Sequence, residues 1–191
     1  MEKHTLFRLL AVAAFFATYV TIVLGGNVMA SNAGLACPDW PTCHGTFAPP
    51  LAGATAVEWS HRLAAFFTGL LVAGMALVGL VSERRRPVLR GLAVSAALLV
   101  VAQAFLGGLV VVTGLVGMVV LLHFVFATIL LGVLLLIAFL ANLRSIPKRW
   151  TVWAESAADE EAASVTLARM ERSGTPAEHR DPGAPSRAAN R

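Results

Sequence analysis

The chain has 191 residues, of which 57% are hydrophobic and 14% are charged, with a formal net charge of +4. This composition is more apolar than that of an ordinary soluble domain, which excludes an average water-soluble fold. The charged side chains lie mostly toward the two ends, so the excess of Lys and Arg indicates membrane orientation and not nucleic-acid binding.

Four apolar runs are each long enough to cross the roughly 30 Å hydrocarbon core of a bilayer as a helix. We expect these spans at about 6–29, 58–81, 88–113 and 118–143. The first run has a basic start, as a signal peptide does, but its apolar stretch is too long for a cleaved signal, which predicts an uncleaved span. The expected fold class is an all-α integral membrane protein, a four-transmembrane-helix bundle within residues 1–150.

The flanks of the spans predict the orientation of the bundle. Lys and Arg precede the first span, separate the second from the third and follow the fourth, whereas 30–57 and 114–117 contain neither. Because cytoplasmic flanks are enriched in Lys and Arg, we expect both termini in the cytoplasm and the loop 30–57 on the outer side. Residues 151–191 are rich in Ala, Pro, Gly and Arg and are predicted to form a largely disordered cytoplasmic tail.

A weak internal repeat relates the two halves of the membrane region. The sequence "LGGNV" at 24–28 resembles "LGGLV" at 106–110, and each is followed by a loop and by a span with a histidine near its outer start, His61 or His123. The pattern predicts two helix pairs related by a pseudo-two-fold axis along the membrane normal. Paired glycines also simply allow helices to pack closely, so the matched histidines are the stronger evidence.

The two histidines are the first candidates for chemistry, because ionisable groups within spans are costly and usually functional. At similar depth in a four-helix bundle, two neutral imidazoles suit the axial positions of a haem iron. The glycine pairs at 25–26 and 107–108 would leave room for a flat macrocycle. The alternative for each histidine is a hydrogen bond to a neighbouring helix.

The sequence "EWSHR" places Glu58 and His61 on one helix face, three residues apart. The carboxylate could perform acid–base or charge-stabilising work beside the ligand of His61, or act only at the helix N-terminus. Arg62 could pair with a haem propionate or extend to the outer headgroups. Gln103 and Asn27 are weaker polar candidates, which interhelical hydrogen bonds would also explain.

The only two cysteines, Cys37 and Cys43, lie in the outer loop within "GLACPDWPTCHG". A disulfide that stiffens the loop and a redox-active pair are both consistent with this location. A metal site of Cys37, Cys43 and His44 lacks a fourth ligand and the usual spacing, so it is disfavoured.

Together, "LGGNVMASNAGLACPDWPTCHG", "VEWSHRLAAFFTGLL", "QAFLGGLVVVTGL" and "LLHFVFA" resemble the haem A synthase family over roughly 19–132. The resemblance implies oxidation of the C8 methyl group of haem O to a formyl group, giving haem A for terminal oxidases. It implies haem b as cofactor, His61 and His123 as axial ligands, Glu58 as the catalytic carboxylate and a loop cysteine pair at Cys37 and Cys43. The implied location is the prokaryotic plasma membrane.

The chain departs from the typical family pattern in two respects. It has one four-helix half where typical bacterial members have two, so two haem sites would require a homodimer, another homo-oligomer or a partner chain. Met29 and Ser31 replace an Arg and a Thr that many members carry after the first glycine pair. Haem O synthase and the terminal oxidase assembly are further implied partners, and the electron donor is not indicated.

Three other functions remain open from the sequence. A bis-histidine membrane cytochrome b would hold haem without making haem A. A membrane thiol oxidoreductase would use Cys37 and Cys43, but it usually needs a second cysteine pair and would leave both histidines without a role. A structural membrane subunit would bind no haem and oxidise no thiols.

Overall fold

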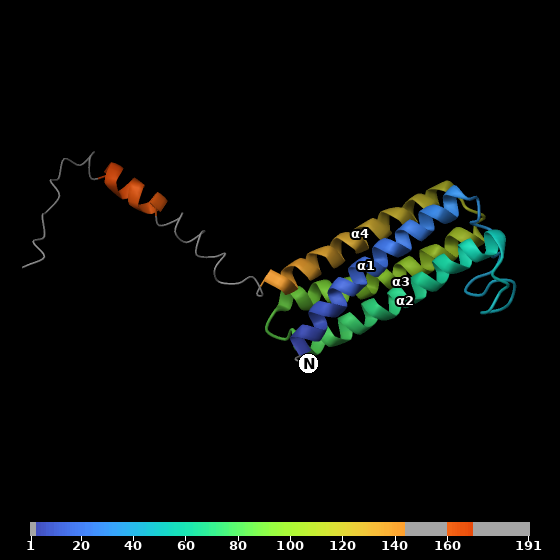
Figure 1. Ribbon diagram of the computed structural model, residues 1–191, viewed down its shortest axis with the longest axis horizontal. Helices are drawn as coiled ribbons and strands as arrows, with labels where there is room; N and C mark the ends of the chain where they lie inside the picture. Colours follow the sequence, from blue (N-terminus) through green and yellow to red (C-terminus); the bar gives the residue numbers. More distant parts are fainter. Residues whose placement is uncertain (1–2, 144–159, 170–191) are drawn as a thin grey trace, which may run out of the picture. The chain divides into compact units, whose positions relative to one another are not determined.

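The computed structural model describes residues 3–143 and 160–169 (Figure 1). The membrane region consists of four helices, α1 (Lys3–Ala30), α2 (Gly53–Ser82), α3 (Pro87–Val112) and α4 (Gly117–Asn142). Each helix is long and apolar enough to cross a membrane, which confirms the predicted four-helix, all-α fold. The helix bounds lie close to the predicted ones, except that α2 already begins at Gly53.

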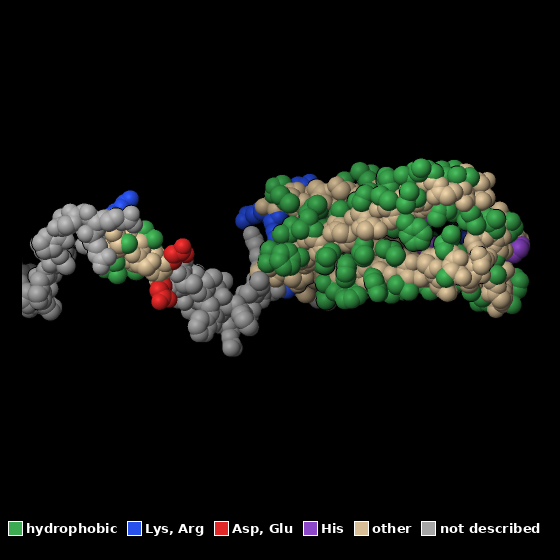
Figure 2. All heavy atoms as spheres, turned by 90° about the horizontal axis from the view of Figure 1, so that it is seen from above, with side chains coloured by type: hydrophobic (Ala, Val, Ile, Leu, Met, Phe, Trp, Pro, Cys, Tyr) green, Lys and Arg blue, Asp and Glu red, His purple; other side chains and the backbone are tan. Residues whose placement is uncertain are grey.

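The helices form an up-and-down bundle in which each contacts two neighbours. The contacting pairs are α1 with α2, α2 with α3, α3 with α4 and α4 with α1, so α2 and α4 lie diagonally opposite each other. The long loop 31–52 and the short turn 113–116 lie at one end of the bundle, here called the loop end. The α2–α3 turn lies at the other end, here called the arginine end, where Figure 2 shows Lys and Arg side chains gathered.

The packed core fills the half of the bundle nearer the arginine end. Its largest fully buried side chains are Phe7, Val72, Met75, Leu89, Leu134 and Ile137. Gly79 allows close approach here, because an added Cβ would lie 2.8 Å from Cε2 of Phe7. Such van der Waals packing is the main source of helix association in a membrane, where lipid is as apolar as leucine.

Polar contacts fasten the arginine end. The buried carboxylate of Glu83 lies 2.7 Å from Nδ1 of His4, and Arg8 donates to the side chain of Asn142 at 3.0 Å. Arg86 donates to the carbonyl of Leu140 at 2.7 Å. These contacts link the start of α1, the α2–α3 turn and the end of α4.

The half nearer the loop end is packed less tightly. Among the described residues, each helix has a stretch there without a single fully buried side chain; the stretches are 19–27, 59–67, 97–107 and 117–126. We call these four stretches the open half. Both candidate histidines belong to it, so the bundle leaves space at their level.

The chain beyond the bundle forms a separate unit, of which only 160–169 is described, as a helix. The remainder of the predicted tail 151–191 lies outside the described residues. The pseudo-two-fold axis stays a prediction that is compatible with this fold.

Candidate functional site

The loop at the loop end is closed by a disulfide between Cys37 and Cys43, so the predicted pairing is confirmed, and whether the pair is structural or redox-active stays open. Neither cysteine has any exposed surface. Since both sulfur atoms are bonded to each other, the disfavoured metal site with His44 is wrong for this form of the protein.

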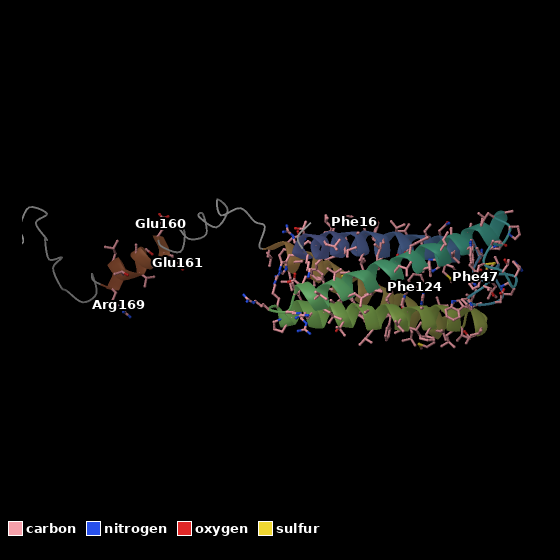
Figure 3. The ribbon with its side chains drawn as sticks, turned by 90° about the horizontal axis from the view of Figure 1, so that it is seen from below. Phe16, Phe47, Phe124, Glu160, Glu161 and Arg169 are labelled. Carbon is pink, nitrogen blue, oxygen red and sulfur yellow. A yellow bond between two sulfur atoms is a disulfide. The ribbon has the colours of Figure 1, made fainter. Side chains whose placement is uncertain are left out.

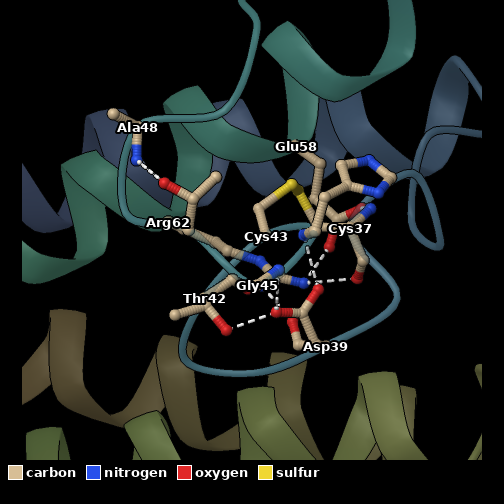
Figure 4. Close-up of a disulfide and its surroundings, with 10 residues drawn as sticks. Cys37, Asp39, Thr42, Cys43, Gly45, Ala48, Glu58 and Arg62 are labelled. Atoms are coloured by element: carbon tan, nitrogen blue, oxygen red, sulfur yellow. Dashed lines mark hydrogen bonds and ion pairs between the residues drawn. A yellow bond between two sulfur atoms is a disulfide. The ribbon is translucent and has the colours of Figure 1, made fainter.

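Within the closed loop, the carboxylate of Asp39 holds the following turn (Figure 4). It accepts hydrogen bonds from the backbone N–H groups of His44 at 2.6 Å and Gly45 at 2.9 Å, and from the hydroxyl of Thr42. The Thr42 hydroxyl, followed by these N–H groups, holds the pKa of Asp39 below its ordinary value. His44 and Gly45 both have positive φ, at 53° and 75°, a conformation that favours glycine.

Arg62 of α2 fastens this loop to the bundle (Figure 4). Its Nη1 donates to the carbonyls of Asp39 and Thr42, both at 2.6 Å, and its Nη2 donates to the carbonyl of Cys37 at 2.8 Å. The same Nη2 pairs with the carboxylate of Glu58, one helical turn away. Three loop carbonyls therefore converge on the two terminal nitrogens of this guanidinium.

Glu58 belongs to the same arrangement. Its side chain is nearly fully buried, and its second oxygen accepts the backbone N–H of Cys37 at 2.8 Å. Both oxygens of the carboxylate thus have partners, one on the loop and one on α2. Glu58 is a fixed negative charge next to His61 in the helix, and it does not cap α2, which begins at Gly53.

The loop also reaches across to the α3–α4 pair. An added Cβ on Gly108 of α3 would lie 2.9 Å from the indole of Trp40, so the ring packs directly on this glycine. An added Cβ on Gly34 would lie 3.1 Å from the side chain of Leu115 in the α3–α4 turn. The loop therefore contacts both helix pairs and lies across the loop end.

Below the loop, His61 and His123 lie in the open half on the diagonal helices α2 and α4. The Nδ1 of His61 lies 3.1 Å from the backbone carbonyl of Thr21, which can only accept, so Nδ1 carries the proton and Nε2 is left as a free acceptor. The Nδ1 of His123 is buried and has no hydrogen-bond partner within 3–143. Gln103 donates to the backbone carbonyl of His123 at 2.8 Å, which fixes α3 against α4.

Each imidazole lies against a glycine of a neighbouring helix, His61 of α2 against α1 and His123 of α4 against α3. An added Cβ on Gly25 would lie 3.0 Å from Cε1 of His61, and one on Gly107 would lie 3.3 Å from Cε1 of His123. We call these four residues the histidine layer. The second glycine of each pair does not contact a histidine. Gly26 faces open space, and Gly108 contacts the ring of Trp40.

These features fit a haem held by two axial imidazoles. A histidine that ligates a metal through Nε2 commonly donates its Nδ1–H to a backbone carbonyl, as His61 does. The ring of His123, whose Nδ1 has no hydrogen-bond partner among the described residues, could supply a second ligand, and the open half around it could supply space. Among the described residues there is no group of three or more His, Cys, Asp or Glu that could hold a bare metal ion, whereas a macrocycle supplies its own four ligands.

The structure thus brings the predicted residues into two adjoining groups, Glu58, Arg62 and the disulfide in one and the two histidines in the other. Thr21 and Trp40 were not predicted to take part. Thr21 acts through its backbone carbonyl, for which no side-chain pattern exists. Asn27, a weaker candidate, is exposed.

The chain is similar to known proteins over most of its length. The family model of the COX15-CtaA cytochrome oxidase assembly proteins matches residues 8–57 and 52–170. A haem A synthase of Geobacillus kaustophilus is 38% identical over 150 residues, which cover 78% of this chain and 46% of the relative. A haem A synthase of Bacillus pumilus is 36% identical over 137 residues, covering 70% of this chain and 44% of the relative.

A region of a protohaem IX farnesyltransferase of Haloarcula marismortui is also similar, at 38% identity over 109 residues, which are 57% of this chain and 23% of the relative. The chain spans less than half the length of each of these relatives. Because the family model covers most of the chain, including every residue of the candidate site, the protein is a multi-pass membrane protein that belongs to the COX15-CtaA family of cytochrome oxidase assembly proteins.

Proposed function

We propose that the protein is a haem A synthase, which oxidises the C8 methyl group of haem O to a formyl group. The observation that best supports this is the histidine layer, in which two imidazoles on diagonal helices each lie against a glycine within an incompletely packed bundle. The similarity to haem A synthases of Bacillus and Geobacillus supports the reaction class.

His61 and His123 are proposed as the axial ligands of haem b. When bound, the haem supplies the redox chemistry for oxidation of the methyl group. The Thr21 carbonyl orients the ring of His61 and fixes its proton on Nδ1. Glu58 is proposed as the catalytic carboxylate, in a charge-stabilising role, since both of its oxygens already accept hydrogen bonds. Arg62 is proposed to pair with a haem propionate.

One bundle offers one histidine pair, whereas the reaction needs a cofactor haem and a substrate haem. We therefore propose that a homodimer or larger homo-oligomer provides both sites. The distribution of Lys and Arg supports both termini in the cytoplasm and the disulfide loop outside, in a prokaryotic plasma membrane. The similarity to a protohaem IX farnesyltransferase supports a functional connection with the enzyme that makes haem O.

The test is to produce the chain together with a source of haem O, extract the haems and separate them by chromatography. We expect a haem A peak that disappears in His61→Ala and in His123→Ala. The matched control is His44→Asn on the exposed loop, which should keep the peak because Asn tolerates positive φ. Haem in the purified protein without haem A formation would refute the synthase and identify a membrane cytochrome b.

A further inference from the structure

A groove of about 290 Å³ opens on the surface of the bundle along the seam between α1 and α2. Phe16, Val20 and Phe67 form its exposed rims, and Figure 3 shows Phe16 on the outside of α1. The half-buried side chains of Ala17 and Ala64 line it between these rims. Small residues therefore create the space, and bulky apolar residues border it.

The two side-chain hydroxyls of this groove already use their protons in hydrogen bonds. The hydroxyls of Thr21 and Thr68 bond each other at 2.9 Å, and Thr21 also donates to the carbonyl of Ala17 at 2.9 Å. The groove consequently offers no free side-chain donor to a headgroup or a peptide, and acceptors placed there would lose their hydrogen bonds. Its chemistry suits a hydrocarbon.

The groove lies beside the histidine layer, at the level of His61. Thr21 lines the groove, and its backbone carbonyl accepts the hydrogen bond from His61. Ala64 lies one helical turn beyond His61 on α2, on the same face. The groove thus leads from the level of His61 toward the arginine end, and it opens sideways through the α1–α2 seam.

We propose that this groove is the exit for the farnesyl-derived chain of haem O. The inference rests on the proposed function. A macrocycle in the histidine layer would have its carboxylates toward the polar loop, so its opposite edge would face the packed core. Since that core is filled, a long branched hydrocarbon chain on this edge must leave between helices, and the α1–α2 groove adjoins His61.

We expect the groove to distinguish haem O from protohaem by the space it offers to the chain and not by the free energy of apolar burial. Lipid tails are as apolar as the groove, so moving the chain from lipid into it gains little. A groove that is blocked should therefore exclude the haem with the chain and still accept protohaem, which lacks it. This difference separates an exit from a general part of the haem site.

The test compares binding of haem O and protohaem by the wild-type protein, Ala64→Leu and Ala17→Leu in detergent, followed by absorbance titration. The two variants fill the groove from opposite helices. Ala73→Leu on α2 is the matched control, because Ala73 is exposed and lies outside the groove. Size-exclusion chromatography of each variant reports folding and oligomeric state.

We expect both groove variants to bind haem O at least about tenfold more weakly, with protohaem affinity within about twofold of wild type and the control unchanged. Equal loss of both haems, or no loss of either, would overturn the inference and leave the proposed function intact. A change of oligomeric state in both groove variants would overturn it in favour of a contact between copies. If the wild-type protein bound neither haem, the proposed function would fail and the inference with it.

Discussion

Replacing Arg62 with Gln should release the disulfide loop from the bundle. Arg62 donates to three loop carbonyls at 2.6–2.8 Å and pairs with Glu58, and both side chains are shielded from solvent, at 11% and 4% exposure. A hydrogen bond to a charged group contributes about 1.5–3 kcal/mol, and a buried charge left without its partner costs about 3–5 kcal/mol. Because these contributions overlap, we expect the free energy of loop closure to fall by about 3 kcal/mol. This corresponds to about a 100-fold larger population of the open loop.

The disulfide itself reports this opening. Cys37 and Cys43 have no exposed surface, so a reductant reaches them only when the loop opens. The purified protein is treated with a phosphine reductant under native conditions, and the released thiols are tagged with a maleimide that adds mass. Reduction should be about 100-fold faster in Arg62→Gln than in wild type. Arg62→Lys should fall between them, because an ammonium keeps the charge but lacks the planar fork.

Arg85→Gln is the control, since this arginine is exposed at the arginine end. It should reduce at the wild-type rate. If Arg62→Gln were reduced within about twofold of the wild-type rate, Arg62 would not hold the loop, and the argument from its three carbonyl contacts would be refuted. A wild-type rate in Arg62→Lys would show that charge alone suffices.

Three further predictions concern the same end of the bundle. Gly25→Ala should lower haem binding by crowding the imidazole 3.0 Å away, whereas Gly26→Ala, which faces open space, should not; absorbance titration of both measures this. Gly108→Ala should displace Trp40, whose ring lies 2.9 Å from the added Cβ, and raise the disulfide reduction rate several-fold in the assay above. The Asp39 pKa lies below its ordinary value of 3.8, so its contribution to loop closure is complete above that pH and lost as the pH falls through the folded-state pKa; phosphine reduction should be pH-independent from about 8 to 5 and faster below about 4.

Hydropathy was sufficient to predict the four helices, because each must satisfy its own backbone across the hydrocarbon. It was less informative about helix ends. The start of α2 lies at Gly53 and not at the predicted 58, since its first turn carries Gly, Ala and Thr and extends past the most apolar stretch. Pro87, which suits the first turn of a helix, marks the start of α3 more clearly.

The parts of the candidate site that depend on side-chain type could be predicted from the sequence. The parts that depend on the path of the backbone could not. Two histidines at matched positions and a carboxylate one turn from Arg62 are visible in the sequence. The convergence of three loop carbonyls on Arg62 is not, because it depends on the path of the loop backbone. Gly25 and Gly26 are equivalent in sequence, and only the rotation of α1 decides that the first one faces His61.

Glu58 links the loop to the helix of His61, and this has a consequence for any study of its chemistry. Its two oxygens hold Cys37 and Arg62, so Glu58→Gln changes both the charge at the site and the attachment of the loop. If Glu58 has a catalytic role of its own, haem A formation should fall more than about 100-fold in Glu58→Gln and less in Arg62→Gln, although the second variant opens the loop at least as much. Haem extraction and the reduction assay on the same two preparations measure both quantities. If the loss of haem A in each variant only followed its disulfide reduction rate, Glu58 would act in loop closure alone. If haem A formation were unchanged in Glu58→Gln, Glu58 would have no role in the reaction.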